Sequence, residues 1–326
     1  MKKILNDPYQ YVDEMLAGLC SAHPELYRQA GESGRVIARS EKIKNGKVGI
    51  VSGGGSGHLP IFTGYVGQGL LDACAIGDVF ASPSVDQMAD AMREANGGAG
   101  VLRLYGNYGG DVMNFDMAGE MLEMEDVESS TVLLADDVAS ASKQEREKRR
   151  GVAGMVYAFK IAGAAAEEMN NLNEVTRIAQ NAADACHSVG AALTPCTVPQ
   201  AGKPTFEISD DEMEMGMGIH GEPGVWRGKI KKADEIANEM IDMLLADMDL
   251  TSSSRVSVLV NSLGATPPEE LYILYRIVKS RMEDVGAEIV MPLVGRYATS
   301  MEMTGVSFTF CAVSYTHLTL PTNDLV

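Results

Sequence analysis

The feature that most constrains this chain is a repeated alternation of short apolar runs, rich in β-branched residues, with longer segments of helical periodicity. Such runs predict buried strands, and helices between consecutive strands are typical of a parallel sheet. In the first half we expect strands at Lys47–Ser52, Val101–Tyr105 and Thr131–Ala135, and helices at Gln87–Glu94 and Met113–Glu125. The chain is therefore predicted to begin with an α/β domain whose sheet is mainly parallel.

Two alanine-rich helices, Gly154–Met169 and Glu174–Val189, are expected to close this first domain. The segment Ala191–Pro204 then concentrates proline and glycine, a composition typical of a linker. The alternation resumes after it, with a helix expected at Ala233–Asp247, a strand at Arg255–Asn261 and a helix at Pro268–Val285. Two further apolar runs, Glu288–Val294 and Val306–Phe310, complete this part. We therefore predict a first domain over residues 1–190 and a second, smaller α/β domain over residues 191–312.

Composition excludes several classes of partner. The chain has 27 Lys and Arg against 45 Asp and Glu, a net charge of −18 that disfavours binding to nucleic acid or to anionic membranes. No apolar run is long enough to span a bilayer, and the first residues lack the apolar stretch of a signal peptide. The five cysteines form no C-x-x-C pair, which indicates reduced thiols and no zinc site. We expect a cytoplasmic protein.

A glycine-rich segment, SGGGSGH, follows the first predicted strand and ends at His58. Backbone amides of Gly55, Ser56 and Gly57 could approach a ligand closely there, because glycine has no Cβ. A phosphate-binding Walker loop is excluded, since His58 is followed by Leu59 rather than by the required lysine and hydroxyl residues. We interpret the segment as a ligand-binding loop, with a plain glycine turn as the alternative.

A second glycine-rich segment, GNYGGD, follows the strand predicted at Val101–Tyr105 and ends at Asp111. Ligands of open parallel sheets bind beyond the carboxyl ends of the strands, so Asp111 and His58 could converge on one ligand. The alternative is that Asp111 merely caps the helix that follows.

A third segment, GMGIHG over residues 216–221, matches the G-x-G-x-x-G pattern of dinucleotide-binding proteins by letter. The match is misleading, because acidic residues 210–214 precede it instead of a strand and Glu222-Pro223 follows where a helix should begin. A nicotinamide-dependent oxidoreductase is therefore a distant alternative. The segment presents His220 between glycines, where its ring can reach a small ligand, whereas His23 and His187 fall in helical or helix-end contexts and are interpreted as structural.

The basic stretch Lys143–Arg150 is most simply a solvated surface, with docking of a partner as the alternative. No H-E-x-x-H motif, cysteine–histidine cluster or G-x-S-x-G motif occurs, so neither a metallohydrolase nor a serine hydrolase is indicated.

Six segments occur in the order found in one family: SGGGSGH, NYGGDVMNF, RRGVAG, CTVPQAGKP, GIHGEPG and VNSLGAT. Through them the chain resembles the substrate-binding subunit of dihydroxyacetone kinases, from Met1 to about Phe310. The resemblance implies a two-domain α/β homodimer that binds a short ketose. It also implies that His220 adds to the substrate carbonyl to give a hemiaminal, and that His58 and Asp111 are catalytic.

The chemistry suits these residue types, because a neutral imidazole is a nucleophile toward a ketone carbonyl. Asp111 would accept the proton of the terminal hydroxyl as the phosphoryl group arrives, and His58 would assist proton movement. Gly55, Ser56 and Gly57 would line the ketose. The family places ADP or ATP with magnesium on a separate nucleotide-binding subunit, in some members recharged by a phosphotransfer protein, so no cofactor or metal is expected in this chain.

Two departures from the family pattern leave the substrate open. Leu59 replaces a frequent glutamate and Gly106 replaces a frequent lysine, which admits a tetrulose such as erythrulose. A regulatory paralogue that senses a ketose without kinase activity is a further alternative, although the retention of Asp111 and His58 favours catalysis. The last residues, Val313–Val326 with His317, resemble a non-native tail and are set aside.

Overall fold

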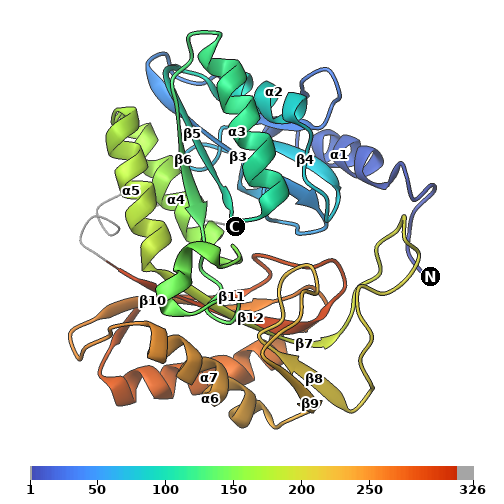
Figure 1. Ribbon diagram of the computed structural model, residues 1–326, viewed down its shortest axis with the longest axis vertical. Coiled ribbons are helices and arrows are strands. Elements are labelled where there is room, and N and C mark those ends of the chain that lie inside the picture. The colour runs from blue at the N-terminus through green and yellow to red at the C-terminus, as the bar shows by residue number, and fades with distance from the viewer. Residues whose placement is uncertain (1, 314–326) are drawn as a thin grey trace. The chain divides into compact units, whose positions relative to one another are not determined.

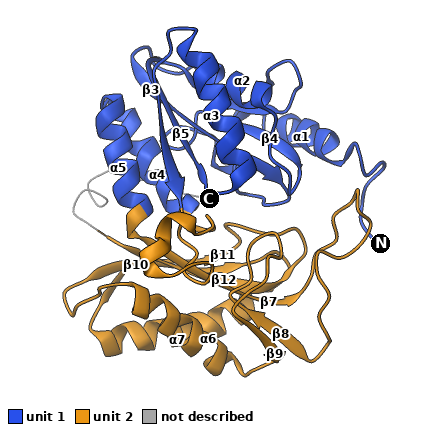
Figure 2. Ribbon diagram, in the orientation of Figure 1, with its two compact units in different colours: residues 1–134, 155–183, 319–326 blue, residues 135–154, 184–318 orange. Residues whose placement is uncertain are grey.

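The computed structural model describes residues 2–313, which fall into two compact units (Figure 2). Unit 1 comprises the described part of Met1–Leu134 and Met155–Ala183, and unit 2 comprises Ala135–Gly154 and the described residues from Asp184 onward. Each unit contains a six-stranded sheet and helices, so the predicted α/β class is confirmed.

The sheet of unit 1 has the strand order β1-β2-β4-β3-β5-β6. Its central pairings, β3–β4, β3–β5 and β5–β6, are parallel, as predicted, while β1–β2 and β2–β4 are antiparallel. The strands are β1 (Tyr27–Ala30), β2 (Val36–Arg39), β3 (Lys47–Ser56), β4 (Ala73–Val79), β5 (Gly98–Gly106) and β6 (Ser129–Leu134).

Helices cover the sheet of unit 1 (Figure 1). They are α1 (Tyr11–Ala22), α2 (Val85–Ala95), α3 (Gly109–Glu123), α4 (Gly154–Glu167) and α5 (Leu172–Ala185), with 3₁₀ turns η1 (Thr63–Tyr65) and η2 (Lys143–Lys148) elsewhere in the chain. Met88 of α2 and Phe115 of α3 pack with Val51 of β3 in one apolar core. The start of α2 is fixed by a capping box between Ser84 and Gln87.

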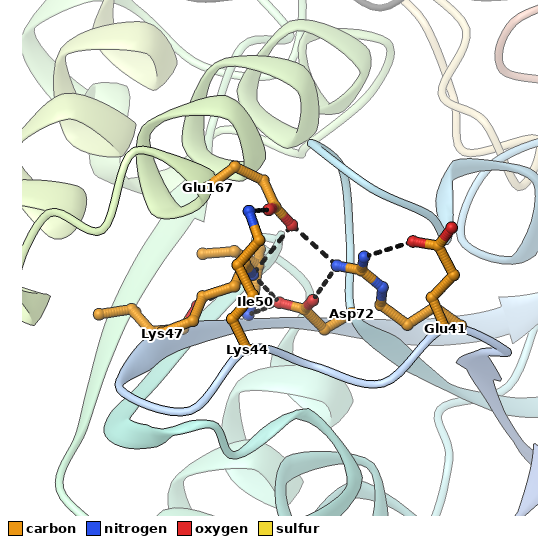
Figure 3. A network of polar contacts seen from close by, with 8 residues as sticks. Glu41, Lys44, Lys47, Ile50, Asp72 and Glu167 are labelled. Carbon is orange, nitrogen blue, oxygen red and sulfur yellow. Dashed lines mark hydrogen bonds and ion pairs between the residues drawn. The ribbon is translucent and has the colours of Figure 1, made fainter.

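A buried cluster of charges ties the sheet of unit 1 to α4 (Figure 3). Asp72 is fully buried and accepts hydrogen bonds from Arg39 (3.0 Å), from Lys47 Nζ (2.6 Å) and from the backbone N–H of Ile50 (2.8 Å). Arg39 also donates to Glu167 at the end of α4, over 2.8 Å. Each buried charge therefore has a partner of opposite sign, as burial requires.

The sheet of unit 2 has the strand order β11-β10-β12-β7-β8-β9. The pairing β10–β11 is parallel, whereas β10–β12, β12–β7, β7–β8 and β8–β9 are antiparallel. Helices α6 and α7 pack on this sheet through residues such as Met240, Leu244 and Ile277. The elements are β7 (Cys186–Thr194), β8 (Glu212–Met215), β9 (Trp226–Lys229), α6 (Ala233–Asp247), β10 (Arg255–Ser262), α7 (Pro268–Val285), β11 (Glu288–Gly295) and β12 (Thr304–Ala312).

The helix predicted at Glu174–Val189 is too long, because α5 ends at Ala185 and β7 begins at Cys186. Residues 186–192 are buried and pair with β12, and these tertiary contacts override the local helical pattern. The predicted linker Ala191–Pro204 accordingly begins inside β7, and its remainder is a loop of unit 2 closed by a bridge between Thr197 and Pro204.

The two units differ from the predicted domains. A boundary at residue 190 would cut β7. Residues 135–154 belong to unit 2, although the next segment, residues 155–183 with nearly all of α4 and most of α5, belongs to unit 1. The chain thus passes between the units more than once. No helix among the described residues is both long and apolar enough to cross a bilayer. The tail expected at Val313–Val326, with His317, lies outside the described residues except for Val313.

Candidate active-site residues

The glycine run after the first strand is part of that strand. Gly53, Gly54 and Gly55 lie in β3 and pair with β4 in register, so the prediction of a loop at these positions is wrong. Their lack of side chains has a packing cause. A Cβ on Gly54 would collide with the ring of Phe62, and a Cβ on Gly55 would lie 2.8 Å from Phe80 Cα. The missing side chains leave room for neighbouring protein atoms. The sequence alone could not show whether that room is filled by protein atoms or by a ligand.

His58 lies just beyond β3. The strand ends at Ser56, and Gly57 turns the chain with φ of +103°, a conformation that favours glycine. His58 is buried, and its ring stacks on Phe80 with centroids 4.9 Å apart and planes inclined by 22°. Phe80 follows β4 and donates its backbone N–H to Ser56 at 3.0 Å. The imidazole is therefore held by contacts at the ends of two parallel strands.

Asp111 lies in the first turn of α3, just after β5. The residue that caps this helix is Tyr108, without a side-chain hydrogen bond, so the alternative that Asp111 is the N-cap is wrong. A carboxylate in the first turn still interacts favourably with the helix dipole. Asp111 is buried, and the start of α3 packs closely on the loop after β4, because a Cβ on Gly110 would lie 2.6 Å from Ser82 Oγ. Since β3 and β5 are adjacent and parallel, Asp111 and His58 follow the same edge of the sheet, as expected.

The segment that carries His220 is a loop of unit 2 between β8 and β9. The acidic residues before it were not expected to form a strand, but Glu212–Met215 is β8, because Glu214 is buried and bonded to Arg227 of the neighbouring β9. No helix follows the glycines, so the dinucleotide-binding pattern remains unsupported. The glycines have local causes instead, since Gly216 and Gly221 adopt φ of +81° and +89°.

Glu222 holds His220 at two points. Its Oε2 accepts the backbone N–H of His220 at 2.9 Å, and its Oε1 lies 2.9 Å from the ring Nδ1. Burial raises the pKa of Glu222, but the hydrogen bonds and charge of His220 outweigh burial and lower that pKa to about 2. Glu222 is therefore ionised at neutral pH. The His220 side chain is 24% exposed, so the ring is fixed on one side and accessible to a ligand.

Arg150 connects this loop to the body of unit 2. Its Nε donates to Asp137 Oδ2 at 2.9 Å, and its Nη2 donates to the backbone carbonyl of Gly216 at 3.2 Å. A Cβ on Gly218 would lie 2.6 Å from Arg150 Nη1 and closer still to the carboxylate of Glu222. Gly218 thus leaves room for the ends of both side chains.

The basic stretch Lys143–Arg150 is solvated only in its first part. Residues 143–148 are largely exposed, as expected, but Arg149 is buried and forms a bidentate pair with Asp247 at 2.7 and 2.8 Å. The prediction of a solvated surface is wrong for Arg149 and Arg150, because both pair with carboxylates of unit 2.

Two further histidines, His23 and His187, lie in or next to regular secondary structure. His23 ends α1, as expected, whereas His187 lies in β7 instead of a helix and contacts Asp247 at 3.2 Å. Burial and the charge of Arg146 lower the pKa of His187, although Asp247 opposes the shift. The cysteines of the described chain are free thiols, four of them buried, and the described residues contain no cluster of His, Cys, Asp and Glu arranged to hold a metal.

Sequence reasoning missed Glu222 and Arg150. Both stand in segments that carried the family resemblance, Glu222 in GIHGEPG and Arg150 in RRGVAG. A carboxylate two residues after a histidine was the available signal for Glu222. Arg150 gave no local signal, because it lies 66 positions from Gly216 along the chain and reaches its carbonyl only through the fold.

Comparison with known proteins supports the resemblance. A family model described as the Dak1 domain matches residues 17–324. The chain is 44% identical over 309 residues to the dihydroxyacetone-binding subunit DhaK of a PTS-dependent dihydroxyacetone kinase from Listeria innocua, covering 95% of this chain and 93% of that subunit. It is 40% identical to the DhaK subunit of the PEP-dependent kinase of Escherichia coli, covering 96% and 94%. A D-erythrulose kinase of Mycolicibacterium smegmatis is 41% identical, but only 53% of that protein is covered.

Solved structures agree with these matches. The dihydroxyacetone kinase of C. freundii superposes with a TM-score of 0.88 and 32% identity, covering 97% of this chain and 58% of that chain. A dihydroxyacetone kinase operon co-activator, DhaQ, has a TM-score of 0.86 and 32% identity, with 92% of each chain covered. The near full-length matches in sequence and fold show that the chain belongs to the Dak1 family, together with the dihydroxyacetone-binding DhaK subunits.

Proposed function

We propose that this protein is the ketose-binding subunit of a dihydroxyacetone kinase, and that His220 holds the ketose as a hemiaminal while its terminal hydroxyl is phosphorylated. The observation that carries the proposal is the pairing of His220 with Glu222 in a chain that matches dihydroxyacetone-binding subunits along nearly their whole length. A partly exposed imidazole beside an ionised carboxylate is a suitable nucleophile for a carbonyl carbon.

In this proposal Asp111 is the general base and His58 exchanges protons with the substrate oxygens. Both are buried at the carboxyl edge of the parallel sheet, and backbone groups of Ser56 and Gly57 lie beside them in sequence. Gly55 remains a proposed substrate contact through its backbone alone. Covalent capture would select ketoses over polyols such as glycerol, since only a carbonyl can add an amine.

The phosphoryl donor would come from another protein. Two relatives are named as subunits of PTS- or PEP-dependent kinases, and the kinase of C. freundii has been crystallised with AMP-PNP and Mg²⁺. We propose a nucleotide-binding subunit carrying ADP or ATP with magnesium, with a phosphotransfer protein as the source of phosphate where ADP is bound. We also propose that this chain forms a homodimer.

Intact-mass measurement under native conditions tests the capture step. The protein with dihydroxyacetone should gain the mass of one whole ketose, because addition to a carbonyl expels no water, and it should gain nothing with glycerol. His220→Ala should abolish the adduct, while His23→Ala, at the end of α1, should retain it. An adduct that survives in His220→Ala would contradict the proposal.

The matching co-activator makes a regulatory role the second candidate. Asp111→Asn separates the two roles, because capture does not need a base whereas phosphoryl transfer does. With a nucleotide-bearing kinase subunit added, we expect Asp111→Asn to form the adduct normally but to lose roughly 10²–10⁴-fold in phosphorylation. A wild-type protein that captures ketose but never supports phosphorylation would instead indicate a sensor.

The proposal does not by itself decide between dihydroxyacetone and erythrulose as the ketose. Erythrulose is favoured as an alternative by the match to a D-erythrulose kinase and by Leu59, which is 40% exposed next to His58. Parallel assays of kcat/KM with dihydroxyacetone and erythrulose decide between them, and we expect dihydroxyacetone to be preferred.

A further inference from the structure

Two polar side chains of β5 contact α3. Arg103 and Tyr105 are two residues apart, so they lie on the same face of the strand, which packs on α3. Tyr105 is fully buried, and only 12% of the Arg103 side chain is exposed. Val101, the preceding residue on this face, is apolar and buried. An ordinary apolar contact between strand and helix would continue that pattern, so the two polar side chains need another cause.

Tyr105 holds a phenylalanine of α3. Its ring stacks on the ring of Phe115, with centroids 4.3 Å apart and planes inclined by 21°. The tip of Phe115 also approaches β3, because a Cβ on Gly53 would lie 3.2 Å from Phe115 Cζ. Phe115 is therefore packed against β3 and β5 together. A side chain fixed by two strands leaves α3 little freedom to rotate about its axis.

Arg103 holds α3 through the helix backbone. Its Nη1 donates to the carbonyl of Phe115 at 2.7 Å, near the middle of the helix. The guanidinium lies directly beside Gly119, where a Cβ would be 2.4 Å from Nη1. Glycine destabilises a helix interior relative to alanine. The contact with Arg103 explains Gly119, since any side chain there would displace the guanidinium from the helix.

Asp111 belongs to the face of α3 that these contacts fix. It precedes Phe115 by about one helical turn, and both side chains are buried. The N-cap of α3 makes no capping hydrogen bond through its side chain, so the first turn is not fixed in that way. The carboxylate therefore follows any rotation or shift of the part of α3 that Tyr105 and Arg103 hold.

We propose that Tyr105 and Arg103 are positioning residues for Asp111. They hold α3 in one orientation and thereby place the carboxylate where the substrate hydroxyl loses its proton. The catalytic part of this inference rests on the proposed function, in which Asp111 is the general base. The placement of the carboxylate by the two side chains of β5 does not.

The proton step shows why this placement matters. As the phosphoryl group arrives, an electron pair of the ketose hydroxyl oxygen forms the bond to phosphorus, and the bond from phosphorus to the donor oxygen breaks. The O–H bond of the hydroxyl also breaks, and its proton passes to the carboxylate of Asp111. A general base has to lie within about 2.6–3.2 Å of the oxygen that it deprotonates. A misplacement of about 1 Å can cost roughly 10²-fold in rate.

Steady-state phosphorylation of dihydroxyacetone tests the proposal, with ATP, magnesium and a nucleotide-bearing kinase subunit added to the full chain. Tyr105→Leu removes the stacked ring and should lower kcat by roughly 10²-fold, and Arg103→Met should lower it by roughly 10-fold. KM and the mass of the ketose adduct should not change, because capture is assigned to His220 of unit 2. Tyr105→Phe keeps the ring and should stay close to the wild type. An equal loss in Tyr105→Phe would contradict the role of the stacked ring.

Leu122→Ala is the matched control. Leu122 is buried in the same core and on the same helix, but it lies about three turns beyond Asp111. Its truncation opens a cavity and should lower the melting temperature by an amount comparable to Tyr105→Leu. It should leave kcat unchanged, because Phe115 keeps its contacts. A similar fall in kcat for Leu122→Ala would reduce the effect of Tyr105→Leu to general destabilisation and overturn the proposal.

Double variants show whether the effect passes through Asp111. In an Asp111→Asn background the base is absent, so adding Tyr105→Leu should lower kcat no further. Independent actions would instead multiply, and the double variant would lose the product of the two single effects. Such multiplication would overturn the positioning role.

A spectroscopic measurement separates this proposal from the proposed function. With ¹³C in the aspartate carboxyl groups, the Asp111 signal is assigned by its absence in Asp111→Asn. In the ligand-free protein that signal should move in Tyr105→Leu and Arg103→Met and stay in place in Leu122→Ala. An unmoved signal in the first two variants would overturn the positioning role. If the signal moves as expected but Asp111→Asn phosphorylates at the wild-type rate, Asp111 is not the base, and the proposed function fails while the placement of its carboxylate stands.

Discussion

Two networks of paired charges in this protein contain similar groups but differ in how far they are buried. In unit 1, Asp72 and Glu167 neutralise Arg39 and Lys47, and each of these charges lies at or near full burial (Figure 3). Lys47 Nζ donates to Asp72 and to the carbonyl of Val48, and Asp72 also accepts the backbone N–H of Ile50.

In unit 2, the buried Asp137 pairs with Arg150, which donates to the carbonyl of Gly216 in the loop that carries Glu222 and His220. Glu222 pairs there with His220, whose side chain is 24% exposed. The difference lies in the group at the end of each network. The Asp72 network ends in groups that neutralise each other, whereas the network of unit 2 ends in the partly exposed imidazole that we propose captures the ketose. Burial of charge alone therefore does not distinguish the proposed site from a structural network.

The largest expected effect comes from breaking the Asp72 network. Asp72→Ala leaves Lys47 and Arg39 buried without their main counter-charge, and removal of one partner from a buried pair costs about 3–5 kcal/mol. Denaturant unfolding should report that loss, with ketose capture by the folded protein unchanged. Glu41→Gln, which removes an exposed partner of Arg39, is the control and should change the free energy of unfolding by less than about 1 kcal/mol.

In unit 2 we expect a loss of ketose capture with little loss of stability. In Gly218→Ala the new methyl group would collide with Arg150 and the Glu222 carboxylate, which displaces the ring of His220. A displacement of about 1 Å can cost roughly 10²-fold in rate, so capture should fall by that order while the melting temperature changes little. Gly67→Ala, where a Cβ meets no atom within 4 Å, should behave as the wild type. Equal capture by the two variants would show that the loop does not depend on this close approach.

The smallest expected effect is a pH dependence shared by both networks. Burial raises the pKa of Glu167, but Lys44, Arg39 and Lys47 lower it to about 2, from an ordinary value of 4.5. A lowered pKa stabilises the folded state above the ordinary value, and this contribution disappears as the pH falls toward 2.

The difference in unfolding free energy between wild type and Glu167→Gln should thus be constant above about pH 5 and shrink below it. Glu222→Gln should show the same profile, because the pKa of Glu222 is also lowered to about 2. A difference that grows on acidification would show that neither carboxylate is stabilised in its ionised form.

Local patterns predicted those parts of the fold that local physics controls. The bounds of α6 and α7 agree with the sequence periodicity residue for residue. The start of β7 was missed, because an alanine-rich segment fits a helix until its pairing with β12 is known.

The candidate site divides in the same way. His58, Asp111 and His220 were named from short motifs, because each follows a strand or stands among glycines. The glycines of β3 were misread, since packing against Phe62 is invisible in the sequence. The hydrogen bond from Arg150 to Gly216 joins segments 66 positions apart, which no local pattern encodes.

The interleaving of the two units limits how this protein could have arisen and how it can be divided. Residues 135–154 interrupt unit 1, so neither unit is a contiguous stretch of gene and an end-to-end fusion of two ancestral genes cannot produce this order. A fragment ending at residue 190 would retain the first half of β7 without β12, leaving an unpaired strand edge of the kind that drives aggregation. The two units therefore have to be expressed as one chain.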